Sequence, residues 1–309
     1  MVKYVLGHKN PDTDSICAAI LYSNLLNKIG DQAIPVSLGE LNKETKHVLA
    51  YININAPKIV DCIEEGSQVV LVDHNEKNQS IDNIDMLNIS HVIDHHKIDL
   101  KTEKPITIVT EPVGSTCSII AGLFKQYGLN PTKEESLMII SAIISDTLHF
   151  RSPTTTQKDI DIVNELNQIA MINDLNEYAN SLFEAKSDLG DMNTESIIRL
   201  DFKEYEFLGN KYGIGVIETT SPNSILKRKL EIVEALEEIK NKDGLKGILL
   251  SVIDILNEKN TTIISDDHEA EIIRAAFNGE EIEEHIYSLG NIISRKKQII
   301  PVLEKYFTK

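Results

Sequence analysis

Histidine and aspartate residues gather in the stretch "LGHKNPDTDS" at positions 6–15, between an apolar run and a helical pattern. His8, Asp12 and Asp14 carry side chains that can bind a cation or transfer a proton. A single aspartate at such a junction usually caps a helix or closes a turn. Asp12 would then cap a helix that begins near residue 14, and Asp14 would lie in its first turn, where the helix dipole favours a carboxylate.

Further acids and histidines stand at the ends of other apolar runs. "QVVLVD" ends at Asp73, "HVIDHH" ends at Asp94, His95 and His96, and the helical stretch "LMIISAIISD" ends at Asp146. In an open parallel sheet, ligands bind outside the carboxyl ends of the strands. We therefore expect these side chains to converge on one crevice. Converging carboxylates raise one another's pKa unless a positive group lies among them, which favours a bound cation.

The mixture of carboxylates and imidazoles indicates a transition metal, since such ligands suit Mn, Co, Fe or Zn. Six ligands are too many for one catalytic ion with open positions, and they suit two ions about 3.5–4 Å apart that share a carboxylate. Asp73 is the best candidate for the shared carboxylate, because the strand that it ends should lie at the centre of the sheet. Asp94 would instead orient a neighbouring histidine, and the role of His74 stays open. The six candidate metal ligands are His8, Asp12, Asp14, Asp73, His95 and Asp146.

Short apolar runs alternate with helical patterns through the first half of the chain. Several runs are rich in Val and Ile and apolar on both faces, which is typical of a buried parallel sheet. The alternation predicts an α/β fold with a doubly wound, mainly parallel sheet. Strands are expected at residues 3–7, 33–38, 68–73, 91–95 and 106–110, and helices near 14–28, 42–54, 115–127 and 133–146.

A polar stretch, "KSDLGDMNTES" at residues 186–196, predicts a linker between a first domain at 1–185 and a second domain at 197–309. Beyond it, a hairpin is expected in "FLGNKYGIGVIET", with Asn-Lys-Tyr-Gly between two extended runs. A long helix and two further strands should follow from "SILKRKLEIVEALEEIKNK", "GILLSVIDIL" and "NTTIIS". The second domain is therefore expected to be a smaller mixed α/β unit.

The composition of the chain indicates which partners it can bind and in which cellular compartment it works. The formal net charge of −17 disfavours binding to nucleic acid or to anionic membranes, and an anionic substrate would need a locally positive site. The three cysteines are far apart and form no CxxC pair, which fits a reducing compartment. Polar residues return by position 8, so no signal-peptide core is expected, and no apolar run approaches a membrane span. We expect a cytoplasmic protein.

Six motifs occur in a fixed order: "GHKNPDTDS", "VDHNE", "VIDHH", "EPVGST", "ISDT" and, near the end, "SRKKQ". This set resembles the family II, manganese-dependent inorganic pyrophosphatases of the DHH phosphoesterase superfamily, over nearly the whole chain. The resemblance implies hydrolysis of pyrophosphate to two phosphates by a hydroxide that bridges two metals, in a site between the two domains. The family's regulatory insertion has no room between "VDHNE" and "VIDHH".

The resemblance also implies roles for individual residues. It implies that His8, Asp12 and Asp73 bind one metal. It also implies that the second metal is bound by Asp14, Asp73, His95 and Asp146, so that Asp73 is shared. It implies two Mn²⁺ per subunit, with Co²⁺ as an alternative, Mg²⁺ bound to the substrate, and a homodimer through the first domain. The residues implied to contact the substrate phosphates are His96, Lys203, Arg295 and Lys296.

Other interpretations remain open from the sequence. Lys and Arg residues near a C-terminus often form only a solvated face. A related phosphodiesterase or exopolyphosphatase would share the first-domain motifs, but the nucleotide-cleaving relatives usually carry a "GGGH"-like motif, which this sequence lacks. A metal-binding protein without catalytic activity is the third interpretation.

Overall fold

The computed structural model describes residues 2–188, 190 and 192–308, without the side chains of Lys296 and Lys297. The chain forms two compact units, Met1–Lys186 and Ser187–Lys309. The expected linker at 186–196 begins inside a helix, because α6 (Leu175–Ser187) continues through the boundary. Residues 189 and 191 of that segment lie outside the described residues.

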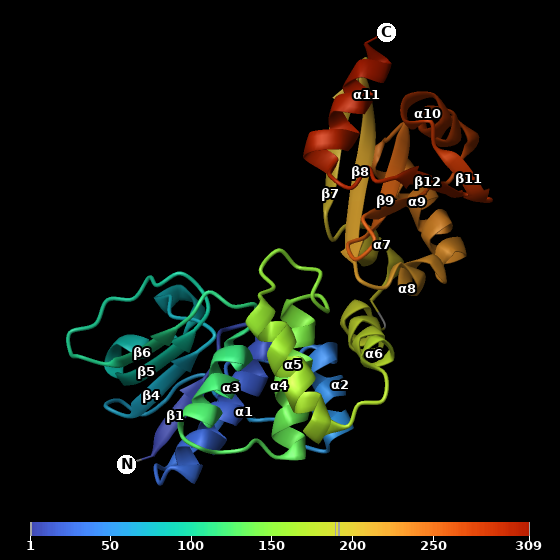
Figure 1. The fold of residues 1–309 in the computed structure, drawn as a ribbon. Helices are drawn as coiled ribbons and strands as arrows, with labels where there is room; N and C mark the ends of the chain where they lie inside the picture. Colours follow the sequence, from blue (N-terminus) through green and yellow to red (C-terminus); the bar gives the residue numbers. More distant parts are fainter. Residues whose placement is uncertain (1, 189, 191, 309) are drawn as a thin grey trace. The chain divides into compact units, whose positions relative to one another are not determined.

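Unit 1 is built on a six-stranded sheet in the order β3-β2-β1-β4-β5-β6, and every neighbouring pair is parallel (Figure 1). This is the doubly wound order, so the predicted fold class is confirmed. The chain leaves β1 in one direction and β4 in the other, which makes the gap between these two strands the topological switch point. The strands are β1 (Lys3–Leu6), β2 (Ala33–Ser37), β3 (Lys58–Ile59), β4 (Gln68–Val72), β5 (Asn88–Asp94) and β6 (Thr107–Thr110).

The helices of unit 1 gather on one side of the sheet, where α1, α3 and α4 pack against one another and α5 packs on α4 (Figure 1). The sequences of α1 and α4 are apolar or small on all sides, as expected of helices that are covered all round. The other face of the sheet is covered by a cluster that includes Ile63, Ile81 and Ile84 from the β3–β5 region. The helices are α1 (Thr13–Lys28), α2 (Lys43–Ile52), α3 (Thr116–Gln126), α4 (Lys133–Asp146) and α5 (Gln157–Ala170), with short 3₁₀ turns at Lys77–Gln79 and Ile84–Met86.

Unit 2 is a mixed six-stranded sheet in the order β11-β12-β10-β9-β8-β7, in which β8 and β9 are parallel and the other pairs are antiparallel. Its strands are β7 (Phe202–Phe207), β8 (Asn210–Thr219), β9 (Gly247–Asp254), β10 (Lys259–Ile263), β11 (Glu280–Glu283) and β12 (Ile286–Gly290). Its helices are α7 (Thr194–Ile198), α8 (Pro222–Leu226), α9 (Lys229–Asp243), α10 (Asp267–Phe277), a π-helical turn at Arg295–Ile299 and α11 (Ile300–Phe307).

The first hairpin of unit 2 differs from its prediction. The turn between β7 and β8 consists of Leu208 and Gly209, both with positive φ, and the predicted turn residues Asn210 to Gly213 belong to β8. A two-residue turn of this kind matches the twist of the paired strands. The predicted long helix is also interrupted, since α8 ends at Leu226 and α9 starts at Lys229.

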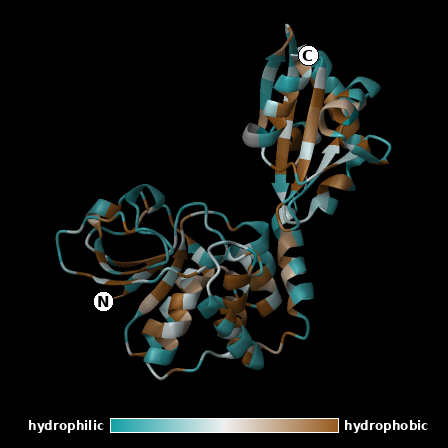
Figure 2. Ribbon diagram, turned by 45° about the horizontal axis from the view of Figure 1, so that its top comes forward, coloured by the Kyte–Doolittle hydropathy of each residue, from teal (hydrophilic) through white to brown (hydrophobic). Residues whose placement is uncertain are grey.

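Apolar residues concentrate on the strands of both sheets and on the helix faces that cover them (Figure 2). In unit 1, Val69 to Val72 and Val92 are almost completely buried. In unit 2, two separate clusters cover the sheet, one around α9 and one around α10 and α11. Within the described part of the chain, none of the helices combines the length and the apolar character that a membrane span requires.

A buried carboxylate joins α10 to the sheet of unit 2. The side chain of Glu269 is fully buried, and its Oε1 accepts a 2.6 Å hydrogen bond from the amide of Ile248. Its Oε2 accepts a 2.6 Å bond from the amide of Ser265, and the ammonium of Lys240 lies 3.1 Å from Oε1. Removing this carboxylate would leave the buried amides without an acceptor, while Lys240 would keep its ion pair with Asp266.

We therefore expect Glu269→Ala to lower the free energy of unfolding by about 3–5 kcal/mol, because the amides of Ile248 and Ser265 lose their acceptor at about 1–3 kcal/mol each. The measurement is urea unfolding of the full chain followed by far-ultraviolet circular dichroism. Glu271→Ala is the matched control on the same helix, because Glu271 is exposed, and it should change stability by less than about 0.5 kcal/mol. Equal stability of the two variants would contradict the assigned role of Glu269.

Candidate metal centre

The carboxyl ends of β1, β4 and β5 bring most of the candidate ligands to one edge of the unit 1 sheet. His8 follows β1, Asp73 follows β4 directly, and His95 follows β5. These three strands are neighbours and parallel, so their ends meet at the switch point. The remaining ligands come from helix ends. Asp12 and Asp14 lie at the start of α1, and Asp146 is the last residue of α4.

Asp73 lies at the middle of the cluster. Its Oδ2 is 3.4 Å from Nε2 of His8, and its Oδ1 is 3.4 Å from Nε2 of His95. Nε2 of His8 is also 3.5 Å from Oδ2 of Asp12. The two oxygens of one buried carboxylate therefore face two different imidazoles, which is the arrangement that a carboxylate shared between two cations requires.

Three groups of side chains place one ligand atom each within 4.8 Å of one another. Two of these groups contain Asp73, and together the three groups include all six candidate ligands and His96. They are His8 with Asp12 and Asp73, Asp14 with His95 and Asp146, and Asp73 with His95 and His96.

The backbone at Asp73 is left-handed. This residue has a φ of 60°, in a region that aspartate adopts more readily than most residues other than glycine. Its amide donates a 3.0 Å hydrogen bond to the carbonyl of Ile93 in the neighbouring strand β5. The position of Asp73 at the end of β4 is therefore fixed by its backbone as well as by its side chain.

Asp12 caps α1 and at the same time faces the cluster of candidate ligands. Its Oδ1 accepts a 2.9 Å bond from the amide of Ser15 and caps α1. Its other oxygen, Oδ2, is the one that faces His8. A helix cap and a ligand position are therefore compatible in one carboxylate.

Asp14 is fully buried in the first turn of α1 and is held by the N-terminus of α3. It accepts hydrogen bonds from the hydroxyl of Ser115 at 2.8 Å and from the amides of Thr116 and Cys117 at 2.6 and 3.1 Å. The hydroxyl of Thr116 donates a 3.0 Å bond to Asp73. Helix N-termini favour negative charge, so α3 stabilises a carboxylate that is otherwise surrounded by acids.

The segment before α3 fits closely against α5. The amide of Gly114 donates a 2.9 Å bond to Oδ2 of the buried Asp159, and a Cβ at position 114 would lie 2.5 Å from Cγ2 of Thr147. The motif "EPVGST" is part of the family resemblance, but the sequence predicts no role for its residues. The signal that could have revealed one is the Ser-Thr pair at the start of a predicted helix, because such residues offer backbone and hydroxyl donors there.

The ring nitrogens of the histidines are oriented by carbonyl and carboxylate groups. Nδ1 of His8 lies 2.7 Å from the carbonyl of Lys9, and Nδ1 of His95 lies 2.9 Å from the carbonyl of Val113. A carbonyl only accepts, so these contacts place the proton on Nδ1 and leave Nε2 as the ligand atom. This is the usual outer arrangement of metal-binding histidines.

Asp94 and His96 form a separate pair beside this cluster. The carboxylate of Asp94 is buried and accepts bonds from Nδ1 of His96 at 2.9 Å and from the side-chain amide of Asn75 at 2.7 Å. The imidazole of His96 is half exposed. His74 is buried, with Nδ1 3.0 Å from the carbonyl of Val72 and with Nε2 unpartnered among the described residues.

The protonation states of the imidazoles follow from their acidic neighbours. Burial alone would lower the pKa of His8, but hydrogen bonds to Asp12 and Asp73 outweigh it and raise the pKa to about 11. Burial also works against the protonated form of His95, yet the bond to Asp73 and the charge of Asp14 raise its pKa to about 9. At neutral pH each ring therefore favours a second proton on Nε2, and the two positive charges offset part of the negative charge of the acids.

The pKa values of the carboxyl groups in the cluster are also shifted. Burial and the charge of Asp73 raise the pKa of Asp14 to about 6, and burial with the charge of Asp14 raises the pKa of Asp146 well above its usual range. Burial would also raise the pKa of Asp73, but hydrogen bonds from His8 and His95 hold it below its usual range. Crowded carboxylates whose protons are hard to remove, beside nitrogen ligands, fit a site for divalent transition-metal ions.

The candidate substrate residues of unit 2 lie on β7 and on the π-helical turn. Lys203 is exposed on β7, and Arg295 opens the turn. The guanidinium of Arg295 donates to the backbone carbonyl of Asp201 at 2.7 Å and to its carboxylate at 2.6 Å. The side chain of Lys296, which the resemblance also implies, lies outside what the structure describes.

Gln298 in the same turn fixes the loop that precedes Arg295. Its Oε1 accepts from the amides of Ile293 and Ser294 at 2.9 and 2.8 Å. Lys203 and Arg295 share a cavity of about 670 Å³. Its other lining residues are Asp201, Tyr205, Val216, Glu218, Ile293, Ser294 and Ile300.

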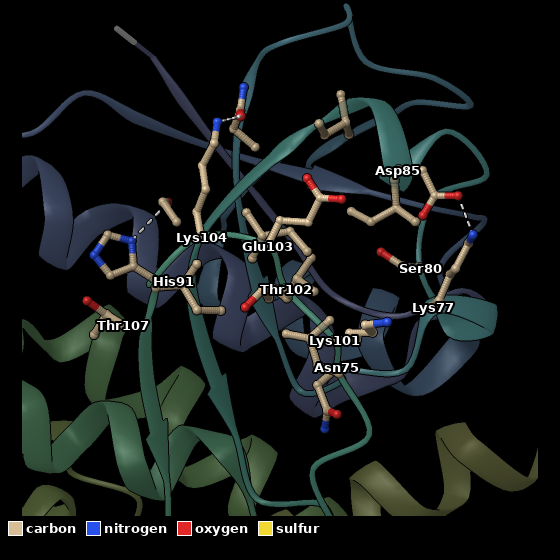
Figure 3. Close-up of a pocket in the computed structure, with 18 of the residues that line it drawn as sticks. Asn75, Lys77, Ser80, Asp85, His91, Lys101, Thr102, Glu103, Lys104 and Thr107 are labelled. Carbon is tan, nitrogen blue, oxygen red and sulfur yellow. Dashed lines mark hydrogen bonds and ion pairs between the residues drawn. The ribbon is translucent and has the colours of Figure 1, made fainter.

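A larger cavity of about 1490 Å³ lies elsewhere in unit 1, between residues 84–91 and 98–107 (Figure 3). Its charged side chains are spread around the hollow and do not converge on one point. Lys77 pairs with Asp85, and Lys104 bonds to Asn88. Among the described residues, none of the six candidate ligands lines this cavity, and its size alone does not make it a functional site.

Comparison with known proteins identifies both units. The model of the "DHH family, N-terminal domain" matches residues 3–146, and the model of the "DHHA2 domain" matches residues 180–306. The chain is 47% identical over 308 residues to a Deinococcus radiodurans protein named "Probable manganese-dependent inorganic pyrophosphatase", with 98% of each chain covered. It is 39% identical over 309 residues to the "Manganese-dependent inorganic pyrophosphatase" of Methanothrix thermoacetophila, covering 99% of this chain and 98% of that relative.

A solved structure from Methanococcus jannaschii, described as a "putative family II inorganic pyrophosphatase", aligns with a TM-score of 0.63 at 35% identity. The alignment covers 99% of this chain and 100% of that one. The resemblance inferred from the ordered motifs is thereby confirmed over the full length. The chain belongs to the family of manganese-dependent inorganic pyrophosphatases, with a DHH domain followed by a DHHA2 domain.

Proposed function

We propose that this protein hydrolyses inorganic pyrophosphate to two phosphates with two Mn²⁺ ions held in the candidate metal centre. The full-length similarity to relatives named for this activity supports the substrate. The observation that carries the two-metal assignment is the position of Asp73, whose two oxygens face His8 and His95 separately.

The proposed ligands divide into two sets. His8, Asp12 and Asp73 would hold one ion, and Asp14, Asp73, His95 and Asp146 would hold the other. The first set is one of the groups of neighbouring ligand atoms, and the second adds Asp73 to the group of Asp14, His95 and Asp146. Bound divalent ions supply two things at such a site: they lower the pKa of a water molecule towards neutrality, and they offset the charge of the phosphate groups. Co²⁺ is an alternative to Mn²⁺, and we propose that Mg²⁺ arrives with the substrate.

Several residues of this protein hold the candidate ligands and His96 in position for the proposed reaction. Thr116 and the N-terminus of α3 hold Asp14 and Asp73 in place, which keeps the ligand carboxylates fixed while charge moves on the substrate. The hydrogen bond that Nδ1 of His96 donates to the carboxylate of Asp94 keeps a proton on this nitrogen and raises the pKa of the imidazole. His96 is therefore suited to donate from Nε2 to a phosphate oxygen.

Unit 2 is proposed to bind the phosphate groups through Lys203, Arg295 and Lys296. The contacts with Asp201 use part of the guanidinium of Arg295 and leave further N–H donors for a phosphate. Because the family resemblance implies a site to which both domains contribute, we propose that residues 186–196 act as the hinge between a catalytic domain at 1–185 and a substrate-binding domain at 197–309.

The remaining assignments rest on the sequence and the family. We propose a cytoplasmic homodimer that associates through the first domain and binds neither nucleic acid nor membranes. The cysteines Cys17, Cys62 and Cys117 are all free thiols, and Cys17 and Cys117 are buried. Unpaired cysteines are typical of a reducing compartment.

The first test is phosphate release from pyrophosphate by chelator-treated protein, with Mn²⁺ added back in the presence of Mg²⁺. We expect rapid release that depends on Mn²⁺ and is lost in Asp73→Ala. A short oligoribonucleotide and a polyphosphate are assayed in parallel. Cleavage of either one without release from pyrophosphate would assign the protein to the phosphodiesterase or exopolyphosphatase branch and would refute the proposed substrate.

Arg295→Ala tests the phosphate-binding role of unit 2. We expect kcat/KM for pyrophosphate to fall by about 10²–10³, the usual effect of removing one donor that stabilises transition-state charge, while Mn²⁺ affinity stays unchanged. Arg295→Lys should restore little, because lysine cannot donate two parallel bonds to one phosphate. Arg274→Ala is the control, since Arg274 is a half-exposed arginine of the same unit that pairs with Glu281. Turnover of Arg295→Ala near that of the control would exclude Arg295 from the site.

The raised pKa values of the imidazoles predict that Mn²⁺ binding releases protons. With pKa values of about 11 for His8 and about 9 for His95, both rings are protonated at pH 7.5 and must lose a proton to act as ligands. Mn²⁺ affinity should therefore increase as the pH rises from 6 towards 9. Titration calorimetry in buffers with different ionisation enthalpies measures the release. We expect at least about two protons per site pair from the imidazoles, and the raised pKa of Asp146 adds to this number. A binding enthalpy that does not depend on the buffer would contradict this model.

A further inference from the structure

A buried glutamate outside the ligand set connects two of the ligand-bearing helix ends. Glu44 lies in α2 and is fully buried. Its Oε2 accepts a 3.1 Å hydrogen bond from the hydroxyl of Thr13 and a 2.9 Å bond from the hydroxyl of Ser145. The ammonium of Lys186 lies 3.3 Å from the same oxygen.

The residues that Glu44 contacts are direct neighbours of ligands in the chain. Thr13 precedes Asp14 at the start of α1, and Ser145 precedes Asp146 at the end of α4. Asp14 and Asp146 belong to the same group of neighbouring ligand atoms, so two acidic side chains lie close together in a buried place. One oxygen of Glu44 therefore holds together the two helix ends that carry this pair of acids.

The third residue that contacts Glu44 is Lys186, which lies at the end of unit 1. Lys186 is the last residue of this unit and lies in the final turn of α6. Besides its ion pair with Glu44, its ammonium donates a 3.2 Å bond to the hydroxyl of Ser145. The last turn of α6 is thus fixed to the same oxygen atom as the two ligand-bearing segments.

A contribution to folding stability does not by itself explain why Glu44 is buried here. A carboxylate loses its hydration on burial, and the other oxygen of Glu44, Oε1, has no hydrogen-bond partner among the described residues. Buried ion pairs often contribute little net stability compared with apolar residues of similar volume. Outer partners of metal ligands, in contrast, typically change metal affinity by 10–100-fold when they are removed.

We propose that Glu44 is a positioning residue that sets the separation of Asp14 and Asp146, and that Lys186 links this separation to the order of the last turn of α6. The inference rests on the metal centre of the proposed function and does not depend on the identity of the substrate. By linkage, Mn²⁺ binding should order the end of α6, and loss of the contact with Lys186 should remove this effect.

The first experiment measures Mn²⁺ affinity by calorimetry on the full chain. We expect Ser145→Ala and Glu44→Ala to weaken binding by about 10–100-fold, and Glu44→Gln, which keeps an acceptor oxygen, to restore most of the affinity. Ser141→Ala is the matched control, because Ser141 is an equally buried hydroxyl one turn earlier in α4 that bonds to Tyr178. Its affinity should equal that of the unmodified protein.

Two results would overturn the role of Glu44. One is unchanged Mn²⁺ affinity in folded Ser145→Ala, which tests the contact even if Glu44→Ala fails to fold. The other is an equal loss of affinity in Ser141→Ala, which would indicate a general effect of disturbing α4. A protein that binds Mn²⁺ as expected but releases no phosphate from pyrophosphate would refute the substrate and leave this inference standing, whereas absence of Mn²⁺ binding would refute both.

The second experiment follows amide hydrogen exchange in residues 182–187 with and without Mn²⁺. We expect Mn²⁺ to slow exchange there in the unmodified protein and to have no such effect in Lys186→Met. Lys28→Met is the control, because Lys28 forms a comparable pair with the buried Glu135 at the opposite ends of α1 and α4. An Mn²⁺ effect in Lys186→Met equal to that in the control would overturn the proposed link to α6.

Discussion

The repulsion among buried carboxylates at the switch point of the sheet is the constraint on which the rest of unit 1 depends. Parallel strands end at one edge, so the fold places Asp73 beside the loop that carries Asp12 and Asp14. Such a cluster is unfavourable in a low-dielectric interior unless positive charge enters it. Burial and neighbouring acids raise the pKa values of Asp14 and Asp146, and the same acids raise the pKa values of His8 and His95.

The surrounding structure holds this unfavourable cluster in place with neutral donors. Backbone amides at the start of α3 and the hydroxyls of Ser115 and Thr116 bind Asp14 and Asp73 without adding a formal charge that would compete with a cation. The same α3 start is anchored to α5 through Gly114 and Asp159. The close arrangement of Asp14 and Asp73 therefore costs stability, and a bound cation would offset that cost. Such a conflict between stability and function is common.

Much of this arrangement could be predicted from the sequence, because it follows from local patterns. Apolar runs that end in acids identify the strand ends, and parallel strands must bring those ends together. The contacts of Ser115 and Thr116 could not be predicted, since they join residues about a hundred positions apart through tertiary packing. The hairpin turn was misplaced because Leu208 gives no turn signal, and β11, with its sequence "EEIE", has the polar character of a loop.

The division into two units separates two electrostatic requirements that conflict. A metal centre needs concentrated negative charge, whereas an anion-binding surface needs positive charge, and the whole chain carries a net charge of −17. In unit 2, Asp201 fixes the guanidinium of Arg295 through its backbone and side-chain oxygens. The arginine is therefore held in one orientation before any phosphate binds, which lowers the conformational entropy that binding would otherwise cost. With the acids in one unit and this oriented cation in the other, the two kinds of charge do not have to be accommodated around the same hydrophobic core.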